Sequence, residues 1–120
     1  MYHINFENPC HVYFIGIGGI SMSGLAEVLM KEGFTVSGSD SKESPLTDHL
    51  SSLGAVIFYD QSISHIPQGT DVVVYTAAIH PEHPEIVDAT KSNIPLLTRA
   101  ELLGQLMRNY KTAINIAGTH

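Results

Sequence analysis

The stretch VYFIGIGGISMSG, residues 12–24, joins an apolar run to a glycine-rich loop. Residues 12–17 are typical of a buried strand, because short continuous apolar runs fit the interior of a parallel sheet. After the loop, apolar side chains recur with the spacing of one helix face, at Met22, Leu25, Ala26 and Leu29. The stretch therefore predicts a strand, a glycine loop and a helix, in that order.

The rest of the chain alternates in the same way between apolar runs and helical stripes. Further strands are expected at residues 34–38, 55–59, 72–75 and 95–97. Helices are expected between and after them, at residues 45–53, 84–91 and 98–110. This order predicts a doubly wound, Rossmann-like α/β fold, with a mostly parallel five-stranded sheet and helices on both faces.

Several residues mark the ends of these helices. Gly33 and Gly54 are placed to end two of them, since glycine accepts the left-handed conformation found there. Ser44, followed by proline, is typical of a helix start. Thr98 and Glu101 have the spacing of a capping box, in which each side chain binds the other residue's free amide.

The end of the chain has no helix to close its last expected strand, residues 113–117. We therefore expect the chain to be part of a longer protein. Residues 1–111 are expected to form one domain, and residues 112–120 to begin a second.

Composition and charge narrow the class of protein. The 120 residues are 43% hydrophobic and 15% charged, which favours an ordered core. Twelve acidic residues against six basic ones give a net charge of −6, which disfavours a nucleic-acid partner. A single cysteine excludes an internal disulfide, and no run approaches the length of a membrane span. These features favour a cytoplasmic protein without a membrane partner.

The glycine loop, with Gly16, Gly18 and Gly19, is the strongest functional signal. Glycines let a ligand approach the backbone, and the start of the next helix suits a phosphate. The strict dinucleotide fingerprint would place glycine at position 21, where this chain has Ser21. A tight turn that binds nothing is the alternative interpretation of the loop.

Other candidate residues follow later strands. Asp40 lies about 20 residues past the glycine loop, where an acid in nucleotide-binding folds holds ribose hydroxyls. Residues 76–79 follow the clearest strand, at an edge where ligands of open sheets gather. Arg99 is a cation at a helix start, where it is electrostatically unfavourable unless an anion or a neighbouring domain lies nearby. A turn aspartate, a plain strand exit and a solvated arginine are the respective alternatives.

His80 and His83 have a spacing seen in metal sites, but prolines interrupt the segment and no third ligand is evident. We therefore predict no metal site. No catalytic grouping of serine, histidine and aspartate can be argued either.

Taken together, five motifs in order resemble the opening of the UDP-N-acetylmuramate–L-alanine ligases, within the Mur ligase family. They are residues 14–19 with 22–26, residues 36–40, residues 77–79 with Pro84 and Glu85 beyond, residues 99–103, and residues 117–120. The resemblance covers nearly the whole chain.

The resemblance implies a three-domain enzyme of peptidoglycan precursor synthesis. Its first domain would bind the UDP part of UDP-N-acetylmuramate, its second ATP and Mg²⁺, and its third would help to bind L-alanine. ATP would convert the muramyl carboxylate to an acyl phosphate, which the amine of L-alanine would attack. Because the chain stops as the ATP loop begins, we expect it to lack ligase activity alone and to need no cofactor.

The resemblance also implies roles for individual residues. The diphosphate would lie on Gly18, Gly19, Ile20, Ser21 and Met22. Asp40 would contact the uridine, and Thr76, Ala77, Ala78 and Ile79 would lie beside the nucleotide. Gly118, Thr119 and His120 would begin the ATP loop.

The chain departs from the family's usual residues at Ser21, Thr76 and His83, where glycine, serine and asparagine are common. Three alternatives remain open: the related murein tripeptide ligase, an NAD-binding module, and a structural domain that binds nothing.

Overall fold

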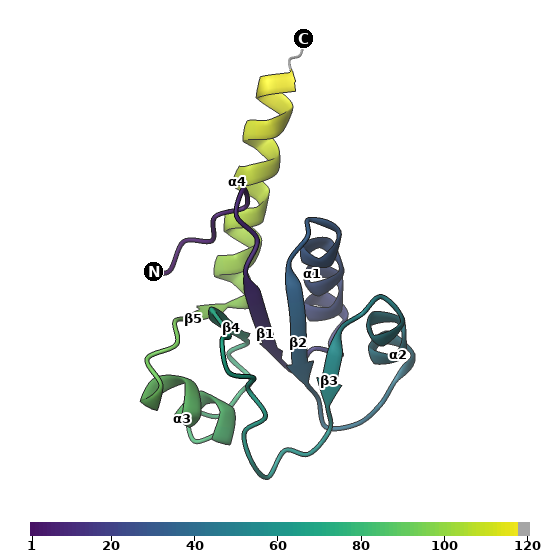
Figure 1. Cartoon of the computed structure of the whole chain (residues 1–120), viewed down its shortest axis with the longest axis vertical. Helices are drawn as coiled ribbons and strands as arrows, with labels where there is room; N and C mark the ends of the chain where they lie inside the picture. Colours follow the sequence, from purple (N-terminus) through teal and green to yellow (C-terminus); the bar gives the residue numbers. More distant parts are fainter. Residues whose placement is uncertain (118–120) are drawn as a thin grey trace.

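The computed structural model describes residues 1–117, with side chains through residue 110. Within that part, five strands form one sheet in the order β3-β2-β1-β4-β5, and four helices accompany it (Figure 1). Every strand pairing is parallel, which confirms the predicted doubly wound fold. The strands are β1 (His11–Ile15), β2 (Thr35–Ser39), β3 (Val56–Phe58), β4 (Val72–Tyr75) and β5 (Leu96–Thr98). The helices are α1 (Ile20–Lys31), α2 (Pro45–Ser52), α3 (Pro84–Lys91) and α4 (Arg99–Ala117).

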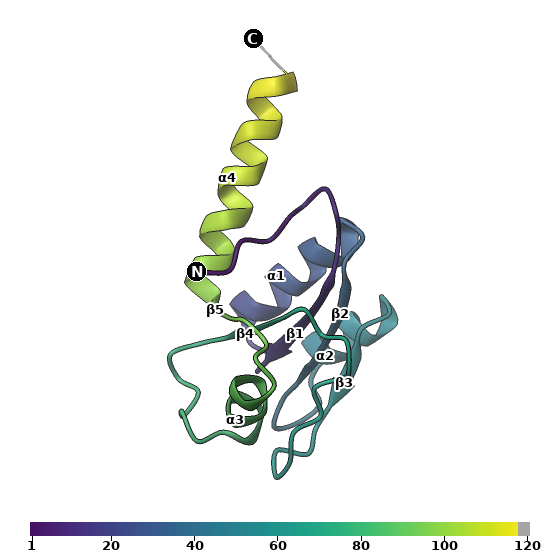
Figure 2. The same ribbon diagram turned by 60° about the vertical axis from the view of Figure 1, so that its left-hand side comes forward.

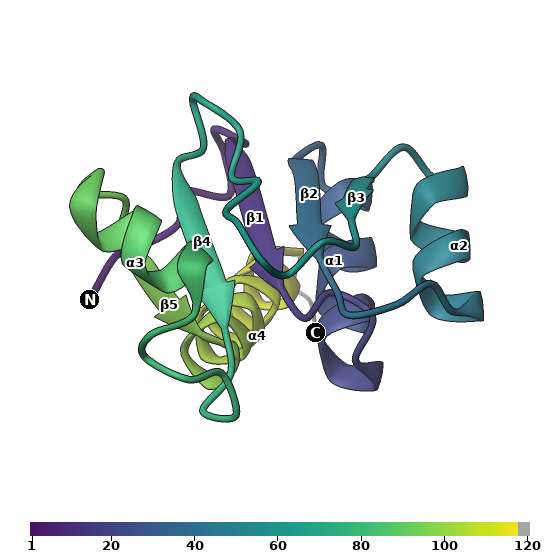
Figure 3. The ribbon, with the colours of Figure 1, turned by 90° about the horizontal axis from the view of Figure 1, so that it is seen from below.

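Strand β1 lies at the centre of the sheet, between β2 and β4 (Figure 3). Its side chains alternate between the two faces, as in any strand. Val12 and Phe14 belong to the core that includes residues of α1 and α4. Tyr13 and Ile15 belong to a second core with Ala89 of α3. Helices therefore cover both faces, as the sequence predicted, and Figure 2 shows α3 and α1 on opposite sides of the strands.

Local signals set the helix ends as expected. Gly33 and Gly54 follow α1 and α2 with φ angles of +95° and +112°, which confirms their role as helix ends. Ser44 caps α2 through its side chain. Before α4, the Thr98 amide donates to Glu101 Oε1 (2.9 Å) and the Glu101 amide donates to Thr98 Oγ1 (3.1 Å). The predicted capping box is therefore confirmed.

Strand β1 ends earlier than the sequence suggested. Gly16 has a φ of +82°, a left-handed conformation that ends the strand at Ile15. Ile17, expected in the strand, lies in the loop and is still fully buried. Its apolar character therefore reflects burial and not strand geometry.

The strand expected at residues 113–117 is wrong, because α4 continues through Ala117. A strand needs a neighbour for its backbone hydrogen bonds, whereas a helix forms them within itself. Figure 1 shows the later turns of α4 extending beyond the sheet, away from the described strands. The boundary expected between residues 111 and 112 falls inside this helix, and the division into domains stays a prediction. The expected ATP-loop residues, Gly118, Thr119 and His120, lie outside the described residues.

None of the helices in the described residues is both long enough and apolar enough to cross a membrane.

Candidate functional site

Four loops leave the sheet at one edge, because the strands that they follow are parallel. In spatial order, they carry Asp40 after β2, residues 16–22 after β1, residues 76–79 after β4, and Arg99 after β5. From β1 the chain proceeds to β2 and β3 on one side of the sheet, and from β4 it proceeds to β5 on the other side. The strand order therefore reverses between β1 and β4. Ligands of open α/β sheets bind at such a point. The fold therefore brings the predicted substrate-binding segments to one edge.

The glycine loop is fixed to the end of β2 by its backbone. The amides of Gly16 and Ile17 both donate to the carbonyl oxygen of Ser39, at 2.8 and 2.9 Å. The Gly19 amide then donates to the carbonyl oxygen of Gly16 at 3.2 Å, which closes the turn. The position of the loop therefore depends directly on the residue before Asp40.

Helix α1 begins without a side-chain cap. Its N-cap is Gly19, and its first turn holds no acidic residue. The first hydrogen bond within the helix runs from the Ser23 amide to the Gly19 carbonyl oxygen, at 2.8 Å. The amides of residues 20–22 precede that bond and have no acceptor within the helix. Together with the helix dipole, they form a set of donors suited to an anion.

Asp40 lies against the glycine loop. Its Oδ2 accepts a hydrogen bond from the Gly18 amide at 2.8 Å, and its Oδ1 accepts one from the Ser41 amide at 2.8 Å. A Cβ atom at position 18 would lie 2.8 Å from Asp40 Oδ2 and 2.9 Å from Thr47 Cγ2, so a side chain there would displace the Asp40 carboxylate. The Ser41 hydroxyl also donates to Oδ1, over a longer distance of 3.4 Å. An ionised carboxylate has about four acceptor sites, so Asp40 can still accept from a ligand hydroxyl.

This contact changes one detail of the sequence prediction. We expected the Gly18 amide to face a diphosphate, but it is bound to Asp40. The Gly19 amide is likewise used within the loop. The donors that remain for an anion are those of Ile20, Ser21 and Met22.

A pocket of about 470 Å³ lies between the ends of β4 and β5. It is lined by residues 76–78 and 98–100. Arg99 Nη1 donates to Ser21 Oγ at 3.1 Å, which links the start of α4 to the start of α1. Ile79 does not line this pocket but packs against the core beneath α3. The structure therefore places a cation beside the uncapped end of α1.

A buried polar cluster lies on the α3 side of the sheet. The carboxylate of Glu85, 1% exposed, accepts hydrogen bonds from the hydroxyls of Tyr13 and Ser39 and from the His65 amide (3.0 Å). Burial, and then the hydrogen bond to Glu85, raise the pKa of Tyr13 far above its usual range. Sequence reasoning gave Glu85 no role, because an acid in the first turn of a helix is ordinarily explained by the helix dipole.

The two histidines with metal-like spacing have local structural roles. His80 Nδ1 accepts a hydrogen bond from the Glu82 amide at 3.0 Å, and His83 caps α3 through the Glu85 amide. In the part of the chain that the structure describes, no three His, Cys, Asp or Glu side chains gather as metal ligands would.

Comparison with known proteins identifies the family. Residues 11–111 match the Mur ligase family, catalytic domain. The chain belongs to the Mur ligase family. It is 61% identical to the UDP-N-acetylmuramate–L-alanine ligase of Agathobacter rectalis over 120 residues, all of this chain and 26% of that protein. It is 54% identical to the ligase of the same name from Clostridium perfringens over 109 residues, 91% of this chain and 24% of that protein. This Mur ligase chain therefore spans about a quarter of the length of these relatives.

Solved structures of Mur ligases share the fold. The UDP-N-acetylmuramate–alanine ligase of Thermotoga maritima superimposes with a TM-score of 0.78 at 32% identity, over 83% of this chain and 23% of that one. A UDP-N-acetylmuramate:L-alanyl-γ-D-glutamyl-meso-diaminopimelate ligase from Neisseria has a TM-score of 0.69 at 26% identity, over 77% of this chain and 29% of that one. The family assignment and the Rossmann-like architecture therefore agree.

Proposed function

We propose that this chain binds the UDP part of UDP-N-acetylmuramate at the carboxyl edge of its sheet. We further propose that a protein of its relatives' full length uses ATP to join L-alanine to the lactyl carboxylate of that nucleotide sugar, in peptidoglycan precursor synthesis. The names of the relatives at 54 and 61% identity support this substrate over that of the tripeptide ligase, whose solved example is 26% identical.

The observation that carries the proposal is the position of the uncapped start of α1 beside Asp40. The amides of residues 20–22 can donate to the diphosphate, and the Asp40 carboxylate can accept from the ribose hydroxyls. The two groups are joined through Gly18, so they hold a fixed relation to each other. A diphosphate attached to a ribose offers complementary groups to both.

Arg99 and the pocket beyond it complete the proposed site. Because Arg99 bonds Ser21 at the start of α1, its guanidinium lies close to the proposed diphosphate position. Thr76, Ala77 and Ala78 line the adjoining pocket with small side chains, which leaves room for part of the nucleotide sugar. Ile79, the last residue of this loop, packs against the core on the α3 side of the sheet and so anchors the loop.

ATP and Mg²⁺ are proposed only because the chain belongs to the Mur ligase family. The residues expected to begin the ATP loop, Gly118, Thr119 and His120, lie outside the described part of the chain. When bound, ATP would supply the activation of the carboxylate. The residues of the described part would then bind and orient the nucleotide sugar.

Thermal unfolding of this chain with four ligands tests the proposed function. UDP-N-acetylmuramate and UDP should each raise the Tm by several degrees, since a ligand at 100 times its Kd stabilises the folded state by about 2.7 kcal/mol. NAD and ATP should leave the Tm unchanged. A response to NAD alone would instead support a dinucleotide-binding module, and no response to any ligand would support a structural domain.

A further inference from the structure

Hydrogen bonds link the loop between β3 and β4 to the backbone of Asp40 and to the start of α3. Gln61 Nε2 donates to the main-chain carbonyl oxygen of Asp40 at 3.0 Å. Gln61 Oε1 lies 3.1 Å from His83 Nε2, and His83 Nδ1 accepts a hydrogen bond from the Glu85 amide at 3.1 Å. Three residues from two separate segments therefore connect the start of α3 to Asp40.

The bonding pattern sets the direction of each hydrogen bond in this connection. Because His83 Nδ1 accepts from an amide, it carries no proton, and in the neutral ring the proton lies on Nε2. His83 Nε2 therefore donates to Gln61 Oε1. That bond orients the Gln61 amide so that its nitrogen faces the Asp40 carbonyl oxygen. The His83 ring and the Gln61 amide therefore each have the one orientation that their hydrogen-bond partners require.

The residue before Asp40 is held by the same helix turn. Ser39 donates its hydroxyl to the buried Glu85 carboxylate, while its carbonyl oxygen accepts the amides of Gly16 and Ile17. The first turn of α3 therefore reaches the end of β2 twice, at the Ser39 side chain and, through Gln61, at the Asp40 backbone.

We propose that Gln61 and His83 are positioning residues of the nucleotide site. They hold the Asp40 backbone so that its carboxylate stays on the Gly18 amide and presents its remaining acceptors to the ribose. The inference rests on the proposed function, because it needs Asp40 to bind the nucleotide. Neither residue contacts the ligand: their effect on binding passes through Asp40.

Two substitutions break the connection without removing the surrounding structure. Gln61→Glu keeps an acceptor for His83 but places a carboxylate oxygen against the Asp40 carbonyl oxygen. His83→Asn keeps a good N-cap for α3 but is too short to reach Gln61. Gln68→Glu is the matched control, since it makes the same chemical change on an exposed side chain of the same loop.

Calorimetric titration of UDP into these variants provides the test. Gln61→Glu and His83→Asn should each weaken UDP binding about 3- to 10-fold, the loss expected for one hydrogen bond, and Gln68→Glu should not change it. In an Asp40→Ala background, Gln61→Glu should have no further effect, because residues that act through a shared partner are not additive. A purely structural role for Gln61 would instead weaken binding equally in both backgrounds, and that result would overturn the proposal.

Two more results separate this inference from the proposed function. If the wild-type chain binds UDP and Asp40→Ala weakens it, but Gln61→Glu and His83→Asn do not, the positioning role is wrong and the proposed function stands. If the wild-type chain binds no UDP, both are wrong. NMR of the ¹⁵N-labelled wild-type chain tests the geometry without variants: the His83 ring should carry its proton on Nε2, and a proton on Nδ1 would contradict the connection.

Discussion

The sheet face that α1 and α4 cover presents Val12 and Phe14, whereas the face that α3 covers presents the hydroxyls of Tyr13 and Ser39 to the buried Glu85 of that helix. The first face is a continuous apolar core, which stabilises the fold through burial. The second face also holds an apolar cluster, but a carboxylate and two hydroxyls are buried within it. These polar groups bind the end of β2, from which Asp40 follows. We infer that the apolar face chiefly supplies stability and that the polar face chiefly fixes the geometry of the candidate site.

A cavity in the apolar face should have the largest effect on stability. Phe14 is fully buried, so Phe14→Ala should lower the free energy of unfolding by about 3–5 kcal/mol. Urea unfolding followed by circular dichroism measures this loss. A loss below about 1 kcal/mol would contradict the assignment of stability to this face.

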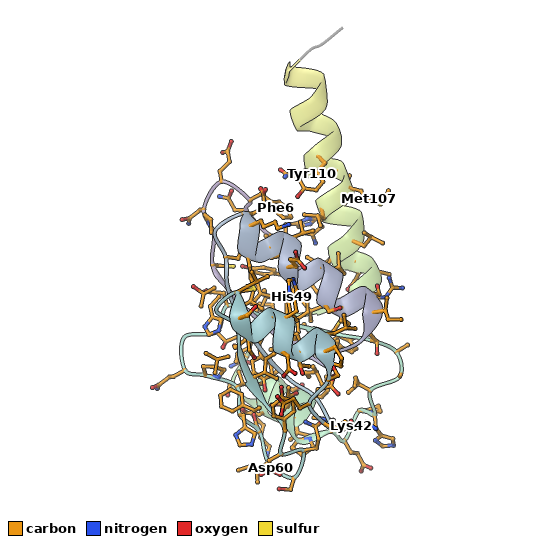
Figure 4. All side chains as sticks on the ribbon, turned by 90° about the vertical axis from the view of Figure 1, so that its right-hand side faces the viewer. Phe6, Lys42, His49, Asp60, Met107 and Tyr110 are labelled. Carbon is orange, nitrogen blue, oxygen red and sulfur yellow. The ribbon has the colours of Figure 1, made fainter. Side chains whose placement is uncertain are left out.

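Removal of the Asp40 carboxylate should affect ligand binding far more than folding. Asp40→Ala should weaken UDP binding by about 1–3 kcal/mol, typical of a hydrogen bond to a charged group. Asp60→Ala is the control, because it removes the same charge from an exposed side chain. Figure 4 shows Asp60 at the same end of the molecule as Lys42, which follows Asp40 by two positions. Calorimetric titration of UDP into the two variants compares their affinities. Equal losses would show that overall charge, and not the Asp40 contact, controls binding.

A methyl group at Gly18 should disturb the same contact from the opposite side. Gly18→Ala should weaken UDP binding about tenfold, or about 1.4 kcal/mol, because the new Cβ would displace the Asp40 carboxylate. Gly24 is the control: apart from its chain neighbours and the backbone of its own helix, no atom lies within 4 Å of a Cβ placed there. Gly24→Ala should leave UDP binding unchanged and stabilise α1 by about 0.5–1 kcal/mol. Similar binding by both variants would rule out the role given to Gly18.

The polar face should show a smaller loss of stability and a distinct pH dependence. Tyr13→Phe should lower the free energy of unfolding by about 0.5–1.5 kcal/mol through loss of its bond to Glu85. Because the folded state raises the pKa of Tyr13, the unfolded chain loses this proton first, from about pH 10. Wild-type stability should therefore fall more steeply above pH 10 than that of the variant. Parallel curves in alkaline urea titrations would contradict this account of Tyr13.

Features that depend on neighbouring residues could be predicted from the sequence. The glycines that end α1 and α2 and the Thr98–Glu101 capping box are set by local backbone chemistry, and the structure confirms them. The fold class followed from the alternation of strands and helices. The strand expected at residues 113–117 failed because a short apolar run fits a strand or a helix, and the partners available decide between them.

Contacts between distant segments could not be predicted. Gln61 and His83 lie 22 positions apart, and no local pattern indicates that they meet behind Asp40. Glu85 was part of a recognised motif, but its burial depends on Tyr13, 72 positions away. The sequence predicted which loops form the candidate site; the tertiary fold shows which residues hold those loops in place.

The most direct test of the proposed site compares UDP with uridine by calorimetric titration into the wild-type chain. If the diphosphate binds the first amides of α1, its absence removes at least two hydrogen bonds to a charged group, each about 1.5–3 kcal/mol. UDP should therefore bind at least about a hundredfold more tightly than uridine. Equal affinities for the two ligands would contradict the assignment of the glycine loop and the start of α1 as the diphosphate site.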